Sequence, residues 1–209
     1  MDCTDPLDVC FCTFSGARPY PTAGFDLNLS PISGGYILEA GSEEGGSLLE
    51  EKLADLPEAT ADQFSERERS RAAVTQRGHP DPEKIYEKVQ QKPDAPMWGE
   101  LADDCVECGA CNFVCPACHC FLLTDLEEEH GFRRFRNWDA CLYPSFAKEA
   151  SGANPRKRRS ERLHGRMEKK FYFLKTDADR WGCVGCGRCI DACPGAIDVR
   201  ETLRKLAHV

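Results

Sequence analysis

Apolar and polar residues alternate over residues 25–29, which read Phe-Asp-Leu-Asn-Leu. The turn-forming sequence Ser33-Gly34-Gly35 follows, and after it comes the mostly apolar stretch 36–40, Tyr-Ile-Leu-Glu-Ala. A period of two is typical of a half-buried β-strand, and a Gly-containing turn between two such stretches indicates a hairpin. The sequence therefore predicts a short β-hairpin here.

The pattern becomes helical from residue 48 to residue 77. Leucines at positions 48, 49, 53 and 56 are spaced for one helix face, and Pro57 is expected to break or kink the run. Residues 65–77 are highly charged and are typical of a solvated helix. A second helix is predicted over 82–91, because Pro82 suits the first turn of a helix.

Helical patterning continues in the C-terminal half. Residues 121–180 are expected to be mostly helical, and residues 196–209 form an amphipathic helix with Ile197, Leu203 and Leu206 on its buried side. The predicted fold is mainly α with a small β-hairpin region. We expect an N-terminal α+β segment over 1–96 and a second domain over 97–209, with 121–180 as an insertion.

Charge and composition exclude several classes of protein. Lys+Arg number 27 against Asp+Glu 35, and a net charge of −8 opposes non-specific nucleic-acid binding. No apolar run approaches the roughly 18 residues of a membrane span. The N-terminus has no basic and apolar signal segment, so we expect a cytoplasmic protein. Because disulfides are rare there, the 14 cysteines are interpreted as metal ligands or redox thiols.

Eight of the cysteines repeat one spacing, C-x2-C-x2-C-x3-C-P. The two copies are Cys105, Cys108, Cys111, Cys115 and Pro116, then Cys183, Cys186, Cys189, Cys193 and Pro194. This is the bacterial ferredoxin spacing, in which three thiolates hold three corners of a [4Fe–4S] cluster. A structural zinc site needs only four ligands and does not require this order. The sequence therefore predicts two [4Fe–4S] clusters.

In two-cluster ferredoxins the fourth cysteine of each motif ligates the other cluster. The predicted ligand sets are Cys105, Cys108, Cys111 and Cys193 for cluster 1, and Cys183, Cys186, Cys189 and Cys115 for cluster 2. Crossed ligation places the clusters side by side, as an electron relay requires. The 67 residues between Cys115 and Cys183 are too many for the short β-rich connection of a compact ferredoxin, and they favour an α-helical ferredoxin-like arrangement.

Six cysteines lie outside this spacing: Cys3, Cys10, Cys12, Cys118, Cys120 and Cys141. Buried free thiols, a third iron–sulfur cluster and a zinc site are all open, and the grouping of the six favours a cluster. The first three cysteines are the best candidate ligands, with a fourth from Cys118, Cys120, Cys141 or a non-cysteine group. His119 is more typical of a packing or hydrogen-bonding residue than of a ligand.

Residues 155–166 form a basic stretch in an acidic protein. Arginines near a cluster would offset its negative charge and raise its potential. A docking face for an acidic partner and a solvated helix are the other interpretations. Nucleic-acid binding is disfavoured, since no aromatic stacking pattern accompanies the charge.

Several segments together resemble a known family. They are Cys10-Phe11-Cys12-Thr13, Gly24-Phe25-Asp26-Leu27, Cys115-Pro116-Ala117-Cys118-His119-Cys120-Phe121, Trp138-Asp139-Ala140-Cys141, Phe146-Ala147-Lys148 and Arg162-Leu163-His164-Gly165-Arg166. The pattern is similar to the dicluster-ferredoxin family, which includes the β subunit of sulfhydrogenases and one of the subunits of anaerobic sulfite reductase. The resemblance implies a multi-subunit oxidoreductase and favours a third cluster. It also implies that a partner chain supplies a segment found ahead of Cys3 in relatives, or that the enzyme is shortened.

We find no nucleotide-binding fingerprint, Walker motif or nucleophile with an adjacent base in the sequence. The expected function is therefore an electron relay that connects a catalytic subunit with a flavin subunit linked to NAD(P)H, or with a ferredoxin. Two alternatives remain: a reductase whose site-differentiated cluster acts directly on a sulfur or disulfide substrate, and a stand-alone ferredoxin. The long insertion argues against the stand-alone carrier.

Overall fold

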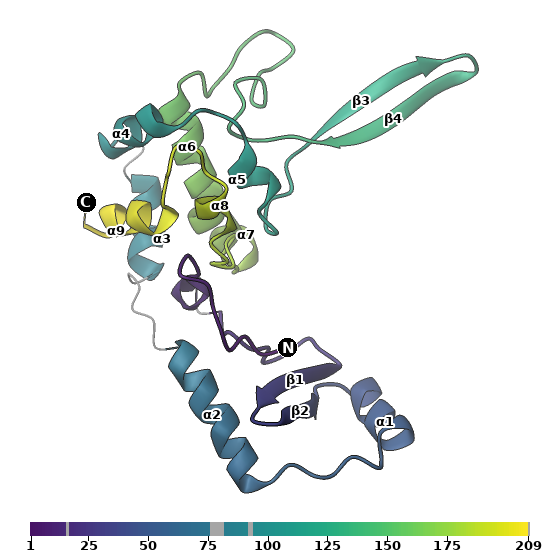
Figure 1. Cartoon of the computed structure of the whole chain (residues 1–209). Coiled ribbons are helices and arrows are strands. Elements are labelled where there is room, and N and C mark those ends of the chain that lie inside the picture. The colour runs from purple at the N-terminus through teal and green to yellow at the C-terminus, as the bar shows by residue number, and fades with distance from the viewer. Residues whose placement is uncertain (16, 76–81, 92–93, 209) are drawn as a thin grey trace. The chain divides into compact units, whose positions relative to one another are not determined.

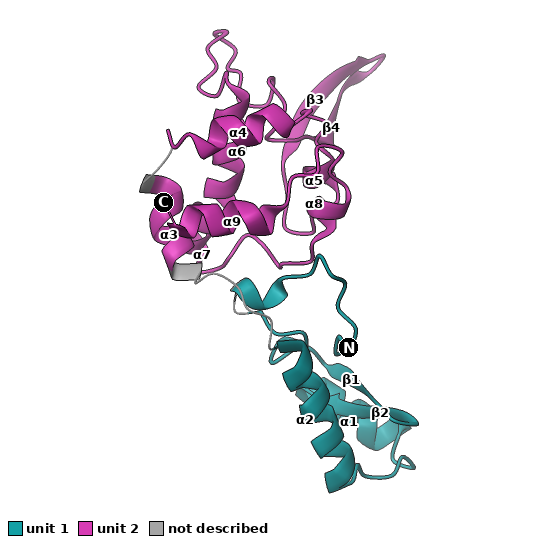
Figure 2. Cartoon of the chain, turned by 60° about the vertical axis from the view of Figure 1, so that its left-hand side comes forward, with its two compact units in different colours: residues 1–79 teal, residues 80–209 magenta. Residues whose placement is uncertain are grey.

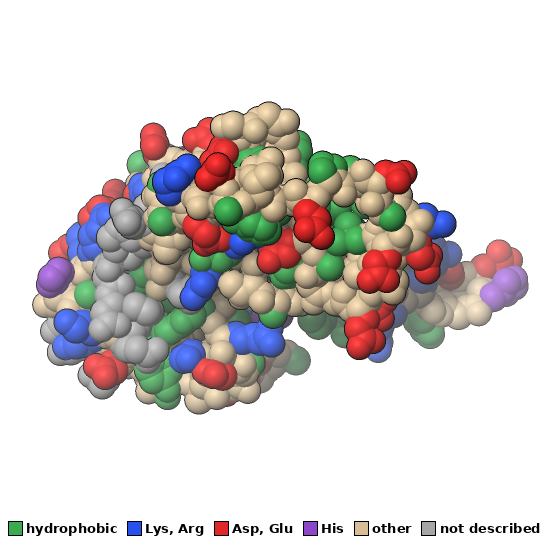
Figure 3. All heavy atoms as spheres, turned by 90° about the horizontal axis from the view of Figure 1, so that it is seen from below, with side chains coloured by type: hydrophobic (Ala, Val, Ile, Leu, Met, Phe, Trp, Pro, Cys, Tyr) green, Lys and Arg blue, Asp and Glu red, His purple; other side chains and the backbone are tan. Residues whose placement is uncertain are grey.

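The computed structural model describes residues 1–15, 17–75, 82–91 and 94–208. The chain divides into unit 1, residues 1–79, and unit 2, residues 80–209 (Figure 2). No helix among these described residues is long and apolar enough to cross a bilayer. On the face seen in Figure 3, acidic and basic side chains are interspersed, so their charges offset one another locally.

The described part of unit 1 is a hairpin with flanking helices (Figure 1). Its elements are η1 (Cys12–Ser15, a 3-10 helix), β1 (Leu27–Ile32), β2 (Gly35–Ala40), α1 (Glu43–Lys52) and α2 (Ala61–Thr75). The predicted hairpin is confirmed, with Leu27 opposite Ala40 and Ile32 opposite Gly35. Its turn includes Gly34, whose φ of 84° suits glycine.

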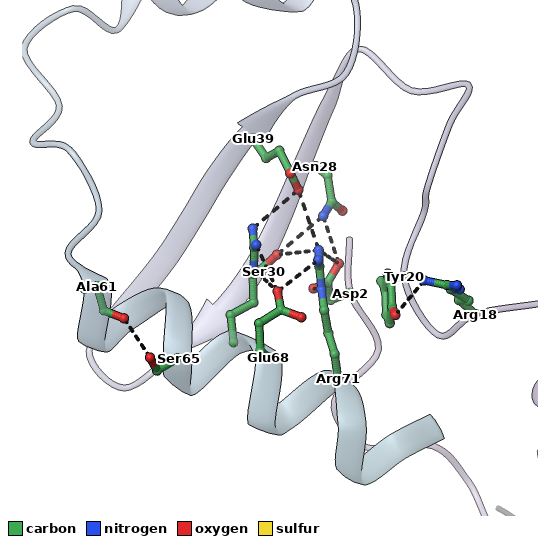
Figure 4. Close-up of polar contacts among 11 residues, drawn as sticks. Asp2, Arg18, Tyr20, Asn28, Ser30, Glu39, Ala61, Ser65, Glu68 and Arg71 are labelled. Atoms are coloured by element: carbon green, nitrogen blue, oxygen red, sulfur yellow. Dashed lines mark hydrogen bonds and ion pairs between the residues drawn. The ribbon is translucent and has the colours of Figure 1, made fainter. Parts of the chain in front are cut away.

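The buried face of β1 is polar. Asn28 and Ser30 are buried, whereas Leu29 is 40% exposed. Asn28 Nδ2 donates to Asp2 Oδ1 at 2.8 Å, and Arg71 Nε of α2 donates to Asp2 Oδ2 at 2.7 Å (Figure 4). The Arg71 guanidinium also lies 4.3 Å from the centre of the Tyr20 ring. A buried ion pair therefore attaches the N-terminus to the hairpin and α2.

The predicted break at Pro57 is confirmed, because α1 ends at Lys52 and α2 begins at Ala61. The first helix begins earlier than predicted, since Ser42 Oγ accepts the Gly45 N–H at 3.0 Å and caps it. Thr60 and Gln63 hydrogen-bond reciprocally at the start of α2, as in a capping box. Residues 76 and 77 of the predicted helix lie outside the described residues.

Unit 2 packs helices around an apolar core. Its elements are α3 (Pro82–Gln91), α4 (Met97–Asp104), α5 (Ala110–Phe113), β3 (Phe121–Glu128), β4 (Gly131–Trp138), α6 (Arg159–Glu168), η2 (Lys169–Phe173, a π-helix), α7 (Leu174–Ala178), α8 (Arg188–Asp191) and α9 (Val199–His208). The fully buried apolar side chains include Ile85, Val89, Trp98, Phe171, Leu203 and Leu206.

The helices predicted over 82–91 and in the tail are confirmed. Helix α3 packs against α6, η2 and α9, so residues 82–91 lie in unit 2 although the sequence placed them in the N-terminal segment. Leu203 and Leu206 form the buried side of α9, as predicted. Ile197 precedes the helix and packs against the core around Ala102 and Leu163. Val209 lies outside the described residues.

The prediction that residues 121–180 are mostly helical is wrong for their first part. Strands β3 and β4 form an antiparallel hairpin from Phe121 to Trp138, and helix begins only at Arg159. An aromatic pair, Phe121 opposite Trp138, and a β-branched–aromatic pair, Thr124 opposite Phe135, form across the strands. Figure 1 shows the hairpin extending away from the helices of unit 2, which explains why most of its side chains are exposed.

Candidate metal centre

The two cysteine motifs have nearly the same backbone structure. Gly109, with φ of 73°, precedes the one-turn helix α5, and Gly187, with φ of 74°, precedes the one-turn helix α8. The N–H of Asn112 donates to the Gly109 carbonyl at 2.8 Å, and the N–H of Ile190 donates to the Gly187 carbonyl at the same distance. Glycine permits this positive φ without steric cost, so each motif makes a tight turn around its cysteines.

The two motifs have different residues at a second position with a left-handed backbone. Gly185 has φ of 62°, and the equivalent residue in the first motif is Glu107, with φ of 56°. Such a backbone is strained for a residue with a side chain. The Glu107 carboxylate accepts a hydrogen bond from the buried Arg162 guanidinium, which holds this conformation in place. The first motif is thus fixed by a side-chain contact that the second motif does not need.

Cysteines of both motifs line one cavity between α4, α6 and α9. Its cysteines are Cys105, Cys108, Cys111, Cys189 and Cys193. Four of these five form the ligand set predicted for cluster 1. In particular, burial raises the pKa of Cys105, and the nearby thiol of Cys193 raises it further. The fourth cysteine of the second motif therefore lies beside the first motif.

Cys115, the fourth cysteine of the first motif, is in turn close to cysteines of the second motif. Burial raises the pKa of Cys183, and the nearby thiols of Cys189 and Cys115 raise it further. Helices α5 and α8 pack against each other, which brings these segments together. Cys186, the remaining member of the predicted second set, is half-buried. The fourth cysteine of the first motif thus lies beside the second motif.

Two buried cations face these cysteines. Arg166 is 5% exposed, and its Nη2 donates to the Cys111 carbonyl at 2.9 Å. Lys170 is 4% exposed, and its Nζ donates to Cys115 Sγ at 3.2 Å and to the Gly182 carbonyl at 2.9 Å. Burial lowers the pKa of both groups, but surrounding thiols outweigh it for each, so the pKa values are raised. Both side chains are therefore positively charged.

The donor set fits a thiolate-ligated iron–sulfur cluster. Among the described residues, neither Arg166 nor Lys170 forms an ion pair with a carboxylate, and the groups that raise the pKa values of both are cysteine thiols. Arg166 Nε is buried and has no hydrogen-bond partner within the described part of the chain. An uncompensated buried donor is costly, and cluster sulfurs accept such hydrogen bonds.

The other six cysteines fall into two groups. Cys3, Cys10 and Cys12 lie in unit 1, where burial raises the pKa of Cys12 and the thiols of Cys10 and Cys3 raise it further. Cys118, Cys120 and Cys141 lie in unit 2 and line a second cavity together with His119. The structure therefore gathers each set of three within its own unit.

The basic stretch has two roles in unit 2. Arg162 Nε donates to the Leu142 carbonyl at 2.9 Å, and its Nη1 donates to backbone carbonyls of residues 156 and 157, so this arginine is structural. Arg166 instead lies among the cysteines, as the electrostatic interpretation predicted. Lys170 was not predicted from the sequence, although its spacing of four residues from Arg166 indicates the same helix face. Asn112, whose Nδ2 donates to Cys141 Sγ at 3.2 Å, was not predicted either.

Two ferredoxin-type motifs lie close together in this helical unit, as the arrangement of a dicluster iron–sulfur domain requires. In agreement, residues 104–197 match the family model described as a 4Fe-4S dicluster domain. The chain is also 30% identical, over 197 residues, to Sulfhydrogenase 2 subunit beta of Pyrococcus furiosus. The aligned region covers 92% of this chain and 58% of that relative. The predicted resemblance to dicluster [4Fe–4S] subunits of the sulfhydrogenase β type is thus confirmed.

The chain spans little more than half the length of this curated relative. No solved structure matches the chain.

Proposed function

We propose that the chain is the electron-relay subunit of a cytoplasmic multi-subunit oxidoreductase and holds two [4Fe–4S] clusters by crossed ligation. The first cluster has Cys105, Cys108, Cys111 and Cys193 as ligands, and the second has Cys183, Cys186, Cys189 and Cys115. When bound, such clusters supply reversible one-electron transfer. The observation that carries the proposal is the cavity that holds four cysteines of the first set, drawn from both motifs.

The protein residues around the cysteines hold charge and exclude water. Arg166 and Lys170 place two buried positive charges beside the thiolates, where a low dielectric makes their effect large. Apolar side chains from α4, α6 and α9 line the rest of the first cavity, including Leu101, Leu163 and Val199. This surrounding limits contact between solvent and the ligands, which is one determinant of cluster potential.

The exposed apolar residues of the β3–β4 hairpin support the proposal that unit 2 binds a partner subunit. Phe121, Leu122, Leu123, Leu126 and Trp138 are about half exposed or more. A two-stranded hairpin is marginally stable alone, and exposed apolar patches mark protein interfaces. The Asp139 N–H donates to the Cys120 carbonyl at 3.1 Å, so the base of the hairpin is continuous with a cysteine group.

We assign this surface to a subunit that exchanges electrons with the chain. The chain then connects a catalytic subunit with a flavin subunit linked to NAD(P)H, or with a ferredoxin. The named relative is itself a subunit of a sulfhydrogenase, which supports an assembly of this kind.

Crossed ligation can be tested with three matched variants of the anaerobically purified chain: Cys105→Ala, Cys115→Ala and Cys183→Ala. Each should lose about four of about eight motif-bound irons. Because Cys115 is assigned to the second cluster, the EPR spectrum of reduced Cys115→Ala should match that of Cys183→Ala and differ from that of Cys105→Ala. A Cys115→Ala spectrum like that of Cys105→Ala would show that each motif holds its own cluster.

A further inference from the structure

Unit 2 contains a second cysteine cavity that the ferredoxin motifs do not explain. Cys118, Cys120 and Cys141 line it, and none of the three belongs to either C-x2-C-x2-C-x3-C repeat. They come from two segments that are adjacent in space. Cys118 follows the first motif in a turn, with its N–H donating to the Cys115 carbonyl at 3.1 Å. Cys141 follows strand β4 and is 4% exposed.

Defined contacts bring these thiols together. The backbone bond from Asp139 to the Cys120 carbonyl aligns the two ends of the β3–β4 hairpin. The side chains of Cys120 and Cys141 are hydrogen-bonded to each other. Asn112 Nδ2 donates to Cys141 Sγ at 3.2 Å, and Asn112 is itself 2% exposed. Such a buried amide donor fixes the direction of the sulfur.

Positive charge lines the cavity and favours an anionic occupant. Arg166, Lys169 and Lys170 line it together with the cysteines. Among the described residues none of these three cations pairs with a carboxylate, while Lys169 lies over the Phe146 ring at 5.0 Å. Arg166 and Lys170 also contact the motif cysteine segments, and together with Lys169 they stabilise thiolates in this cavity.

We propose that Cys118, Cys120 and Cys141 supply three ligands of a third iron–sulfur cluster, adjacent to the proposed pair. The proposal rests on the proposed function and extends the relay within unit 2. Cys3, Cys10 and Cys12, which the sequence favoured as the principal ligands, are not needed for these three positions. Asn112 orients one ligand, and the three cations offset the charge of the thiolates.

The third site is close to the first. Arg166 lines both cavities, so the two cysteine groups share this side chain as a neighbour. Its guanidinium is near the thiols of Cys111 and Cys189 and also near that of Cys118. An electron therefore has only a short distance to pass between the sites. The base of the hairpin lies beside the third site, which makes this site the one nearest to the proposed partner surface.

The test is an iron and acid-labile sulfide measurement on the anaerobically purified full chain, with Mössbauer spectra. We expect about twelve irons in the wild-type chain. Cys120→Ser and Cys141→Ser should each lose up to about four irons and keep the spectrum of the two motif clusters. Cys108→Ala, as a matched control, should lose a motif cluster and keep the third one.

Failure of the inference is distinguishable from failure of the proposed function. Eight irons in the wild-type chain, unchanged in Cys141→Ser, would overturn the third site and leave the relay intact. Zinc bound at this site would also overturn it. Fewer than eight irons, with zinc in the motifs, would overturn the proposed function itself.

A measurement on the wild-type chain covers the case in which the variants fail to fold. In the iron-loaded protein, Cys118, Cys120 and Cys141 should resist alkylation, as mapped by mass spectrometry. They should become reactive when a chelator and an oxidant remove the iron, and reactivity should return to the protected level after reconstitution. Equal alkylation in the loaded and the iron-free protein would overturn the proposal.

Discussion

Glu107 and Gly185 occupy the same position in the two motifs and adopt the same left-handed backbone, with φ of 56° and 62°. The second motif meets this requirement with glycine. The first meets it with a glutamate whose carboxylate is held by the buried Arg162. A positive φ can be expected from the sequence at Gly185 but not at Glu107, because the residue type indicates this backbone only when it is glycine.

The spacing of the eight motif cysteines allowed ligand sets to be predicted, because spacing reports local geometry. The sequence did not indicate that Cys118, Cys120 and Cys141 lie together with buried cations. That grouping depends on the β3–β4 hairpin, which returns the chain from Cys120 to Cys141. The sequence pattern of residues 121–138 predicts helix instead of this hairpin, so it does not indicate that Cys120 and Cys141 are close in space.

Asp2 provides a pH-dependent contribution to unit 1. Burial raises its pKa, but hydrogen bonds from Arg71 and Asn28 outweigh burial and leave the pKa below its usual value. A lowered folded pKa stabilises the fold above the unfolded value of about 4, and this contribution is lost as the pH falls through the folded pKa. Asp2→Asn should therefore cost roughly 1–2 kcal/mol at pH 7 and progressively less as the pH falls below about 4.

Urea titrations at several pH values, followed through the β1 amide resonances, measure this difference. Asp5→Asn is a suitable control, because Asp5 is exposed. A destabilisation by Asp2→Asn that is the same at pH 3 and pH 7 would contradict the assignment.

At the scale of the element, α6 and η2 deliver three basic side chains to one face. Arg162, Arg166 and Lys170 are four residues apart, and all three are buried. Arg162 holds loop carbonyls, whereas the other two contact the cysteine segments. The helix continues through a π-helical turn at Lys169–Phe173, a feature frequently found at functional sites.

The buried cations should set the cluster potentials. A reduced cluster carries one more negative charge than an oxidised one, so a nearby cation favours reduction and raises the potential. Arg166→Met should therefore shift at least one cluster to a more negative potential, on the order of 60 mV, which is a tenfold change in the one-electron equilibrium. EPR-monitored redox titration measures the shift.

Arg158→Met is the matched control, because Arg158 is the N-cap residue of the same helix but its side chain is 70% exposed. It should leave the potentials unchanged. Equal potentials in wild type and Arg166→Met would show that Arg166 serves packing alone.

At the scale of the whole molecule, the sequence predicts the positions of α3 and α9 correctly but not the secondary structure of residues 121–138. Pro82 indicated the start of α3 and apolar spacing located α9, and the two helices pack against each other in one core. The β3–β4 hairpin has no such core, and its strands are solvent-exposed on both faces. A strand with two exposed faces shows no clean alternation of apolar and polar residues, so its pattern is weak.

The exposed hairpin should make the isolated chain self-associate. Replacing Leu122, Leu123 and Leu126 with serine removes apolar surface that no other described part of unit 2 covers. The variant should show less concentration-dependent light scattering than wild type and keep the same iron content. Leu48→Ser and Leu56→Ser in unit 1 are control changes at exposed leucines. Scattering that falls equally in these controls would argue against a special role for the hairpin.

The separation of the motifs in the chain has a consequence for biosynthesis. With crossed ligation, neither cluster has all four ligands until both motifs have left the ribosome, and 67 residues lie between Cys115 and Cys183. At typical elongation rates this interval lasts roughly 3–13 s. During that time the first motif is a set of exposed thiols without a partner. Iron–sulfur insertion must then follow translation, and the nascent chain is most sensitive to oxygen while the β3–β4 hairpin and α6 are being made.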